Sequence, residues 1–177
     1  MNALSRDQIL ALFDALNERL SNACIKGQLF VVGGAVLCLV HRARPSTKDV
    51  DAVFLPKSEL RQLAAEVADA FQVPKDWLND AARGVMSASG SFEPFLALSH
   101  LTVMTATAEY LFAMKAVAMR LGAEFHDESD VRFLLRYLGV ENCEDAISLI
   151  ERYFPPEQIL PKTVFALEEM IQAIKDE

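Results

Sequence analysis

The spacing of apolar residues predicts an amphipathic helix at the start of the chain. Apolar side chains recur every three or four residues, as they do on one face of a helix: Ile9, Leu12, Phe13, Leu16 and Leu20. Ser5 precedes them, and Gln8 follows Ser5 by three residues, which is the capping-box pattern found at helix starts. The chain is therefore expected to open with a helix that is capped by Ser5.

Short, continuous apolar runs in the following part predict buried strands. The expected elements are a strand over 29–32, a turn at Gly33-Gly34, a buried helix over 35–41, a loop over 42–46 and a strand over 50–55. The second strand has apolar residues on both faces, as in a buried sheet, and Pro56 ends it.

The rest of the chain predicts one more pair of strands and then only helices. A helix is expected over 58–71, a short helix over 76–80, and strands over 92–98 and 101–105. Four helices are expected after them, over 108–121, 128–138, 144–154 and 162–175. The predicted fold class is α/β (α+β), with a small mixed-sheet core over 1–107 and a C-terminal helical extension over 108–177 packed on that core.

Charge limits how this chain can bind nucleic acid. The 177 residues carry a formal net charge of −8, so attraction to a polyanion requires a local basic patch. Such a patch is formed in sequence by His41, Arg42, Arg44 and Lys48. The same residues are also compatible with a solvated loop that has no binding role.

Cysteine usage and hydropathy predict a cytoplasmic protein. The three cysteines are odd in number and widely spaced, which argues against a disulfide framework and against a zinc site. The longest nearly apolar run, residues 29–40, is too short to span a bilayer and contains two glycines. We expect no membrane association and no secretion.

Asp49 and Asp51 are the best indication of chemistry in the chain. Residues two apart on a strand lie on the same face with Cα atoms about 6.6 Å apart, so the two carboxylates are expected to lie together. Like charges at this distance repel each other unless a cation lies between them. Divalent cations held by paired carboxylates are the usual means of displacement at phosphorus, so the pair predicts a metal-dependent phosphoryl or nucleotidyl transfer site.

Gly33 and Gly34 stand where the first buried strand gives way to a helix. Glycines at such a turn leave backbone N–H groups free to approach an anion such as a triphosphate. A tight turn against a neighbouring helix also requires glycine, so the two residues do not by themselves decide between these interpretations.

Together these residues resemble a known superfamily. Gly33-Gly34, followed by a helix, a loop and Asp49-x-Asp51, is similar to the signature of the nucleotidyltransferases related to DNA polymerase β. More narrowly, three segments resemble bacterial families allied with the AbiEii-type toxins of abortive-infection systems. These segments are Arg44-x-x-Thr47-x-Asp49-x-Asp51, then Pro74-x-x-Trp77-Leu78-Asn79, and then Tyr110-Leu111-x-x-Met114-Lys115 with Arg120, Asp127 and Asp130.

The resemblance implies transfer of a nucleoside monophosphate from a nucleoside triphosphate, bound in the cleft between core and extension. It places Mg²⁺ (or Mn²⁺) on Asp49 and Asp51, and the nucleotide on Gly33, Gly34, Arg44, Thr47 and Lys48. The acceptor is RNA, a protein or a small molecule. The alternative is a catalytically degenerate nucleotide-binding or protein-partner module of a toxin–antitoxin system.

Many members of the superfamily use a third carboxylate on a later strand. Glu93 is the nearest candidate for that role and for a third metal ligand, and Asp76 and Asp80 are alternatives in a loop. Absence of such a group would remove the base that activates the attacking hydroxyl.

Lys115 is a further candidate catalytic residue. On a helix, its neighbours three and four positions away are all apolar, so its charge lies within a hydrophobic surface. The side chain must extend to solvent or find an anion. A triphosphate oxygen would satisfy it, and so would Asp127 or Asp130.

Overall fold

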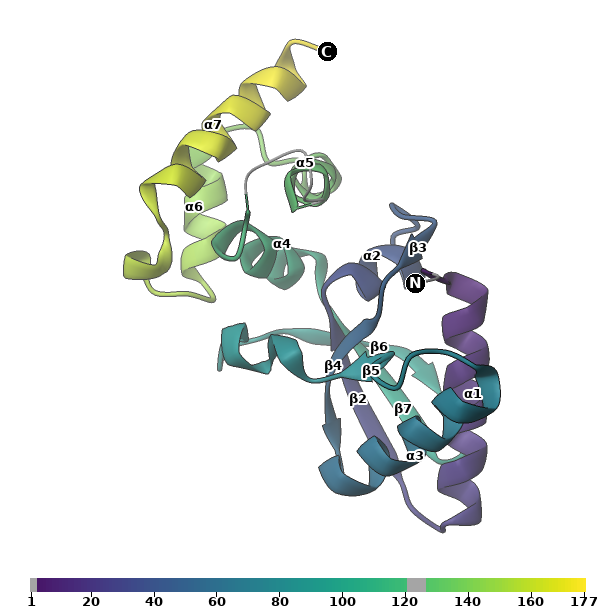
Figure 1. Ribbon diagram of the computed structural model, residues 1–177. Helices are drawn as coiled ribbons and strands as arrows, with labels where there is room; N and C mark the ends of the chain where they lie inside the picture. Colours follow the sequence, from purple (N-terminus) through teal and green to yellow (C-terminus); the bar gives the residue numbers. More distant parts are fainter. Residues whose placement is uncertain (1–2, 121–126) are drawn as a thin grey trace. The chain divides into compact units, whose positions relative to one another are not determined.

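The computed structural model describes residues 3–120 and 127–177, and it divides the chain into two compact units (Figure 1). The first unit comprises Met1–Gly84 and Phe92–Ala106, and the second comprises Val85–Ser91 and Thr107–Glu177. The expected boundary after residue 107 lies one residue from the division after Ala106. No sequence pattern indicated, however, that Val85–Ser91 belongs with the helices.

The first unit is built on a mixed β-sheet, as the expected fold class requires. Within the described residues this sheet has five strands, in the order β5-β4-β2-β7-β6. The strands are β2 (Gly27–Val32), β4 (Val50–Leu55), β5 (Leu78–Asn79), β6 (Phe92–Ala97) and β7 (Leu101–Ala106). Strand β2 pairs antiparallel with β4 and parallel with β7, so apolar runs distant in sequence meet at the centre. A second, two-stranded sheet joins β1 (Leu4–Ser5) to β3 (Ser46–Thr47).

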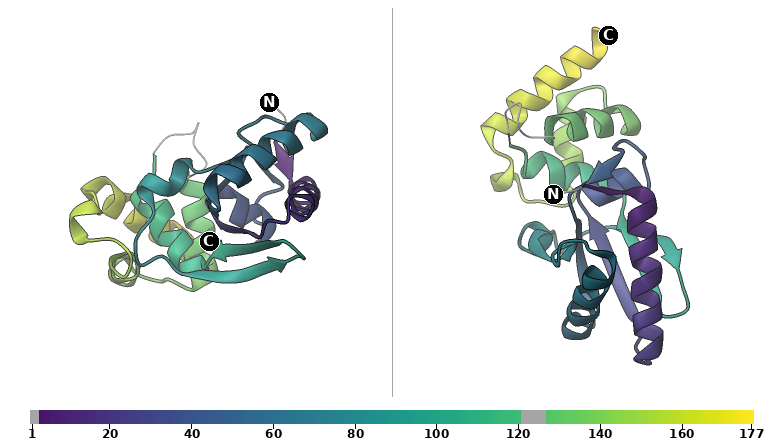
Figure 2. Two further views of the ribbon diagram at one scale, coloured as in Figure 1. Left: turned by 90° about the horizontal axis from the view of Figure 1, so that it is seen from below. Right: turned by 45° about the vertical axis from the view of Figure 1, so that its right-hand side comes forward.

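Helices α1 (Arg6–Asn22) and α3 (Lys57–Phe71) cover one face of the main sheet (Figure 2). A Cβ on Gly27 would lie 2.8 Å from Cδ1 of Leu20 in α1 and 3.2 Å from Cδ2 of Leu60 in α3. The Trp77 indole N–H donates to the Ala64 carbonyl of α3 at 2.9 Å. The core of this unit therefore lies between the sheet and these two helices, and the buried Trp77 belongs to it.

The opposite face of the sheet is only partly covered. Along β4 the exposure alternates, with Val50, Ala52 and Phe54 buried, Asp51 and Val53 half-buried, and Leu55 54% exposed. The expectation of a strand buried on both faces is therefore wrong. The reason for the difference is that Val53 and Leu55 are apolar and yet lie on a face that is only partly covered. An apolar residue on such a face cannot be distinguished by sequence from one on a buried face. Asp51 lies on this half-exposed face.

Several expected elements are confirmed and one is replaced. The capping box of α1 is present, because the Ser5 hydroxyl accepts from the Gln8 N–H and the Gln8 side chain accepts from the Ser5 N–H. Residues 76–80 do not form the expected short helix. They contain β5, whose Leu78 and Asn79 pair with Val50 and Asp51 of β4. Pairing with the sheet prevails over local helix preference here.

The second unit is helical, as expected. Its helices are α4 (Ala108–Val117), α5 (Asp127–Leu138), α6 (Cys143–Glu151) and α7 (Pro161–Lys175). The described residues also contain the 3₁₀ helices η1 (Ala81–Val85), most of which belongs to the first unit, and η2 (Pro156–Gln158). The expected end of the first of these four helices, at residue 121, lies outside the described residues. The buried Tyr110 ties Val85–Ser91 to this unit, because its hydroxyl accepts from the Ser87 N–H at 2.9 Å and its ring lies against Gly90.

Candidate functional site

The glycine turn lies directly against Asp51. Gly33 follows β2 and has a φ of 68°, a conformation that side-chain-bearing residues rarely adopt. A Cβ on Gly33 would lie 3.3 Å from Oδ2 of Asp51, and Val32 just before it is the β2 partner of Asp51. The turn is therefore both strained for other residues and in contact with a carboxylate.

Gly34 begins α2 (Gly34–Leu39) and meets two other expected site residues. A Cβ at this position would lie 2.9 Å from Oγ1 of Thr47 and 3.2 Å from Nη1 of Arg44. Thr47 is buried and lies in β3, where it pairs with Leu4. The structure thus brings the glycine turn, Arg44, Thr47 and Asp51 into one cluster, which we call the glycine–aspartate cluster.

The close approach at Gly34 leads to a testable prediction for stability. We expect Gly34→Ala to destabilise the chain by about 1–3 kcal/mol, because the added methyl overlaps the Thr47 hydroxyl. Thr47→Ala in the same chain should recover part of the loss. Urea unfolding measures both. Gly84→Ala is the control, because nothing lies within 4 Å of its Cβ position, and an equal effect at both glycines would contradict the proposed contact.

Asp49 lies just before β4 and carries a poorly compensated charge. Burial raises the pKa of its carboxyl, and the nearby Asp76 carboxylate raises it further. The charge of Lys48 and a hydrogen bond from the Asn79 side chain lower it, but they do not offset the effect of burial. A cation beside Asp49 would relieve this unfavourable state.

Asn79 lies beside both Asp49 and Asp51, and it was not among the predicted site residues. On β5 it lies directly opposite Asp51, so the two side chains share the half-exposed face of the sheet. Its hydrogen bond to Asp49 brings that carboxylate to the same place. A two-residue strand has no periodicity to detect, and therefore only the structure reveals this role.

Glu93 does not lie with the two aspartates. It pairs with Thr105 of β7, and Thr105 pairs with Val31, whereas Asp51 pairs with Val32. Because neighbouring residues of a strand point to opposite faces, Glu93 lies on the face opposite Asp51. The expectation that Glu93 supplies a third metal ligand is corrected by this register.

Of the two loop alternatives, only Asp76 is near the site. Asp80 forms ion pairs with Lys57 at 2.5 Å and Arg61 at 2.9 Å, so its charge is already compensated. Asp76 acts on the pKa of Asp49 through its charge. Across residues 3–120 and 127–177, no group of three His, Cys, Asp or Glu side chains is arranged to hold a metal ion.

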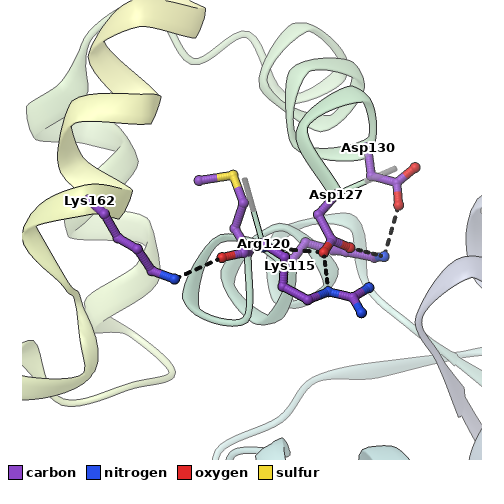
Figure 3. Close-up of polar contacts among 6 residues, drawn as sticks. Lys115, Arg120, Asp127, Asp130 and Lys162 are labelled. Atoms are coloured by element: carbon purple, nitrogen blue, oxygen red, sulfur yellow. Dashed lines mark hydrogen bonds and ion pairs between the residues drawn. The ribbon is translucent and has the colours of Figure 1, made fainter. Parts of the chain in front are cut away.

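Lys115 lies in α4 and takes acidic partners within the helical unit (Figure 3). Its amine lies 2.8 Å from Oδ2 of Asp130 and 3.5 Å from Oδ1 of Asp127, and its side chain is only 16% exposed. Of the fates expected for this lysine, pairing with Asp127 and Asp130 is therefore confirmed. A catalytic role for Lys115 stays a prediction.

Arg120 adds an exposed cation to this buried ion cluster, since its side chain is 63% exposed. Its Nε lies 2.9 Å from Oδ2 of Asp127, and its backbone N–H donates to the same oxygen at 3.2 Å. Burial alone would raise the pKa of the Asp127 carboxyl, but the bonds from Arg120 and the charge of Lys115 hold it below its usual range. Arg120 lies beyond the end of α4 at Val117, whereas the expected helix extended over 108–121.

Comparisons of the chain with known protein families, with curated proteins and with solved structures found no match. All three cysteines are free thiols. None of the helices in the described part of the chain has the length and apolar character needed to cross a membrane. The geometry of the glycine–aspartate cluster is therefore the basis for any statement about function.

Proposed function

We propose that the chain is a Mg²⁺- or Mn²⁺-dependent nucleotidyltransferase that moves a nucleoside monophosphate from a nucleoside triphosphate to an acceptor. The observation that carries this proposal is the contact of the Gly33-Gly34 turn with Asp51, Thr47 and Arg44. It joins an anion-binding element to a cation-binding element in one place. The class also agrees with the resemblance to nucleotidyltransferases related to DNA polymerase β.

The glycine turn and its neighbours supply donors for a triphosphate. Gly33 and Gly34 carry no side chains of their own, which allows phosphate oxygens to approach their backbone. The Arg44 guanidinium can donate two parallel hydrogen bonds to a phosphate, and Thr47 offers a hydroxyl. Lys48 is exposed and adds positive charge beside Asp49.

The carboxylates fit a divalent cation. Mg²⁺ prefers oxygen ligands and is commonly bound by one or two carboxylates together with substrate phosphates. Asp49 and Asp51 would provide those carboxylates, and the raised pKa of Asp49 indicates a negative charge in need of a counterion. When bound, the cation would neutralise charge on the phosphates and polarise the phosphoryl group.

The proposed transfer exchanges one bond to the α-phosphorus for another. An acceptor hydroxyl oxygen bonds to the α-phosphorus, the bond from that phosphorus to the α,β-bridging oxygen breaks, and pyrophosphate leaves. The hydroxyl proton passes to solvent. The cluster residues hold the triphosphate in the orientation that this displacement requires. The acceptor is RNA, a protein or a small molecule.

One observation favours a second candidate function. With Glu93 on the opposite face, no third carboxylate of the described strands lies beside Asp51. A site of this kind can bind a nucleotide without transferring it. The chain would then act as a nucleotide-binding or protein-partner module, for example within a toxin–antitoxin system.

Incubation with each of the four α-labelled nucleoside triphosphates distinguishes these functions. With Mg²⁺ and total cellular RNA present, we expect label to move to RNA or to the protein, with release of pyrophosphate. Asp51→Asn is the matched control and should show none. Metal-dependent binding without any transfer would support the binding module, whereas absence of binding would contradict both.

A further inference from the structure

Asn79 lies beside both aspartates of the candidate site. It lies directly opposite Asp51 on the neighbouring strand and is half-buried. Neighbouring strands lie about 4.7–4.9 Å apart and paired residues point to the same face, so a group at this position shares the immediate surroundings of Asp51. Its side chain also reaches Asp49 through a hydrogen bond.

The orientation of the Asn79 amide is set by its backbone contacts. Its Oδ1 accepts from the Ala81 N–H at 2.9 Å, and a backbone N–H can only donate. Its Nδ2 is consequently the side that faces the acceptors, and it donates to the Asp76 carbonyl at 3.3 Å. Asn79 thus presents N–H donors, and no negative charge, to Asp49.

We propose that Asn79 is a positioning residue that stands where a third carboxylate would complete the metal site. Its neutral amide holds Asp49 on the face of Asp51 while leaving the site with two carboxylates. This inference rests on the proposed function. It explains how an acidic pair keeps a fixed geometry at a sheet edge that is only two residues long.

Two substitutions separate this role from a merely structural one. Asn79→Asp keeps an oxygen for the Ala81 N–H but replaces the donor that faces Asp49 by a carboxylate oxygen. We expect it to raise affinity for Mn²⁺ about tenfold or more, because binding strength increases with the charge of the ligand set. Asn79→Leu removes the support of Asp49 and should lower the affinity by about 10–100-fold, as loss of an outer-shell partner does.

The measurement is Mn²⁺ binding to the full chain, followed by electron paramagnetic resonance and by calorimetry. Asn17→Asp is the matched control, because Asn17 is in the same unit and its Oδ1 likewise accepts a backbone N–H, that of His100 at 2.8 Å. It should bind Mn²⁺ as the parent does. Circular dichroism shows whether each variant is folded, and Asn79→Ser replaces Asn79→Leu if the latter is not.

The outcomes keep the two proposals apart. One outcome is that Asp51→Asn abolishes Mn²⁺ binding while Asn79→Asp and Asn79→Leu (or Asn79→Ser) bind Mn²⁺ as the parent does. The role of Asn79 is then overturned and the proposed function stands. If Asp51→Asn binds Mn²⁺ as tightly as the parent, the metal site itself is wrong and the inference falls with it. A higher affinity for Mn²⁺ in Asn79→Asp together with a lower affinity in Asn79→Leu (or Asn79→Ser) supports the inference.

Discussion

Asp51→Asn is expected to abolish the stabilisation that Mg²⁺ and a nucleoside triphosphate confer together. The parent should gain about 2.7 kcal/mol in free energy of unfolding at a hundredfold excess over the dissociation constant. The variant should gain little, because Asp51 would hold the cation beside the glycine turn. Without ligand, the variant should melt at the parent's temperature or higher, since one of two neighbouring like charges is gone. Thermal unfolding with and without both ligands measures each effect.

Asp80→Asn serves as the control for this experiment. It removes a carboxylate of the same unit that is engaged by Lys57 and Arg61, so the response to ligands should remain that of the parent. If Asp51→Asn melts well below the parent and neither protein responds to metal and nucleotide, Asp51 has a structural role. That result would refute the catalytic interpretation of the aspartate pair.

The second large effect is expected at Lys115. Lys115→Met keeps the apolar stem and removes the charge that lies 2.8 Å from the carboxylate of Asp130, which is only 3% exposed, while Arg120 still pairs with Asp127. Breaking a buried ion pair by removing one partner typically costs about 3–5 kcal/mol, because the remaining charge is buried and uncompensated. Urea unfolding should show a loss of this size in the free energy of unfolding.

A double variant and a second lysine make this prediction specific. Asp130→Asn in the Lys115→Met chain should recover part of the lost stability, because it neutralises the buried carboxylate that has lost the lysine. Lys162→Met is the matched control, since the amine of Lys162 lies 3.4 Å from the Met119 carbonyl and has a neutral partner there (Figure 3). Equal losses for the two lysines would contradict the buried ion cluster as the cause.

Long periodic segments made most of the fold predictable from the sequence. The capped first helix, the apolar runs that became β2 and β4, and the helices of the second unit all repeat a pattern over several residues. The strands that were missed are β1, β3 and β5, each of two residues. Such short strands form only because a partner strand is present, and no local pattern encodes that partner.

The site was predictable to the extent that it is local in sequence. The glycine turn and Asp51 follow from their own motifs, and the structure places them in contact. The position of Glu93 could not be predicted, because the face on which it lies depends on the register of β6 against β7. That register shifts between Pro94 and Leu96. Asn79 was missed as a site residue because its importance comes from the strand opposite it.

The way the chain passes between its two units decides how the protein can be dissected. The backbone crosses after Gly84, after Ser91 and after Ala106, so no single cut separates the units. A fragment beginning at Thr107 would lack Val85–Ser91. It would therefore lose the hydrogen bond from the Ser87 N–H to the Tyr110 hydroxyl and the packing of Gly90 against the Tyr110 ring. Deletion mapping at that point would therefore report loss of folding in place of loss of function. Point substitutions in the uncut chain, by contrast, keep each unit intact.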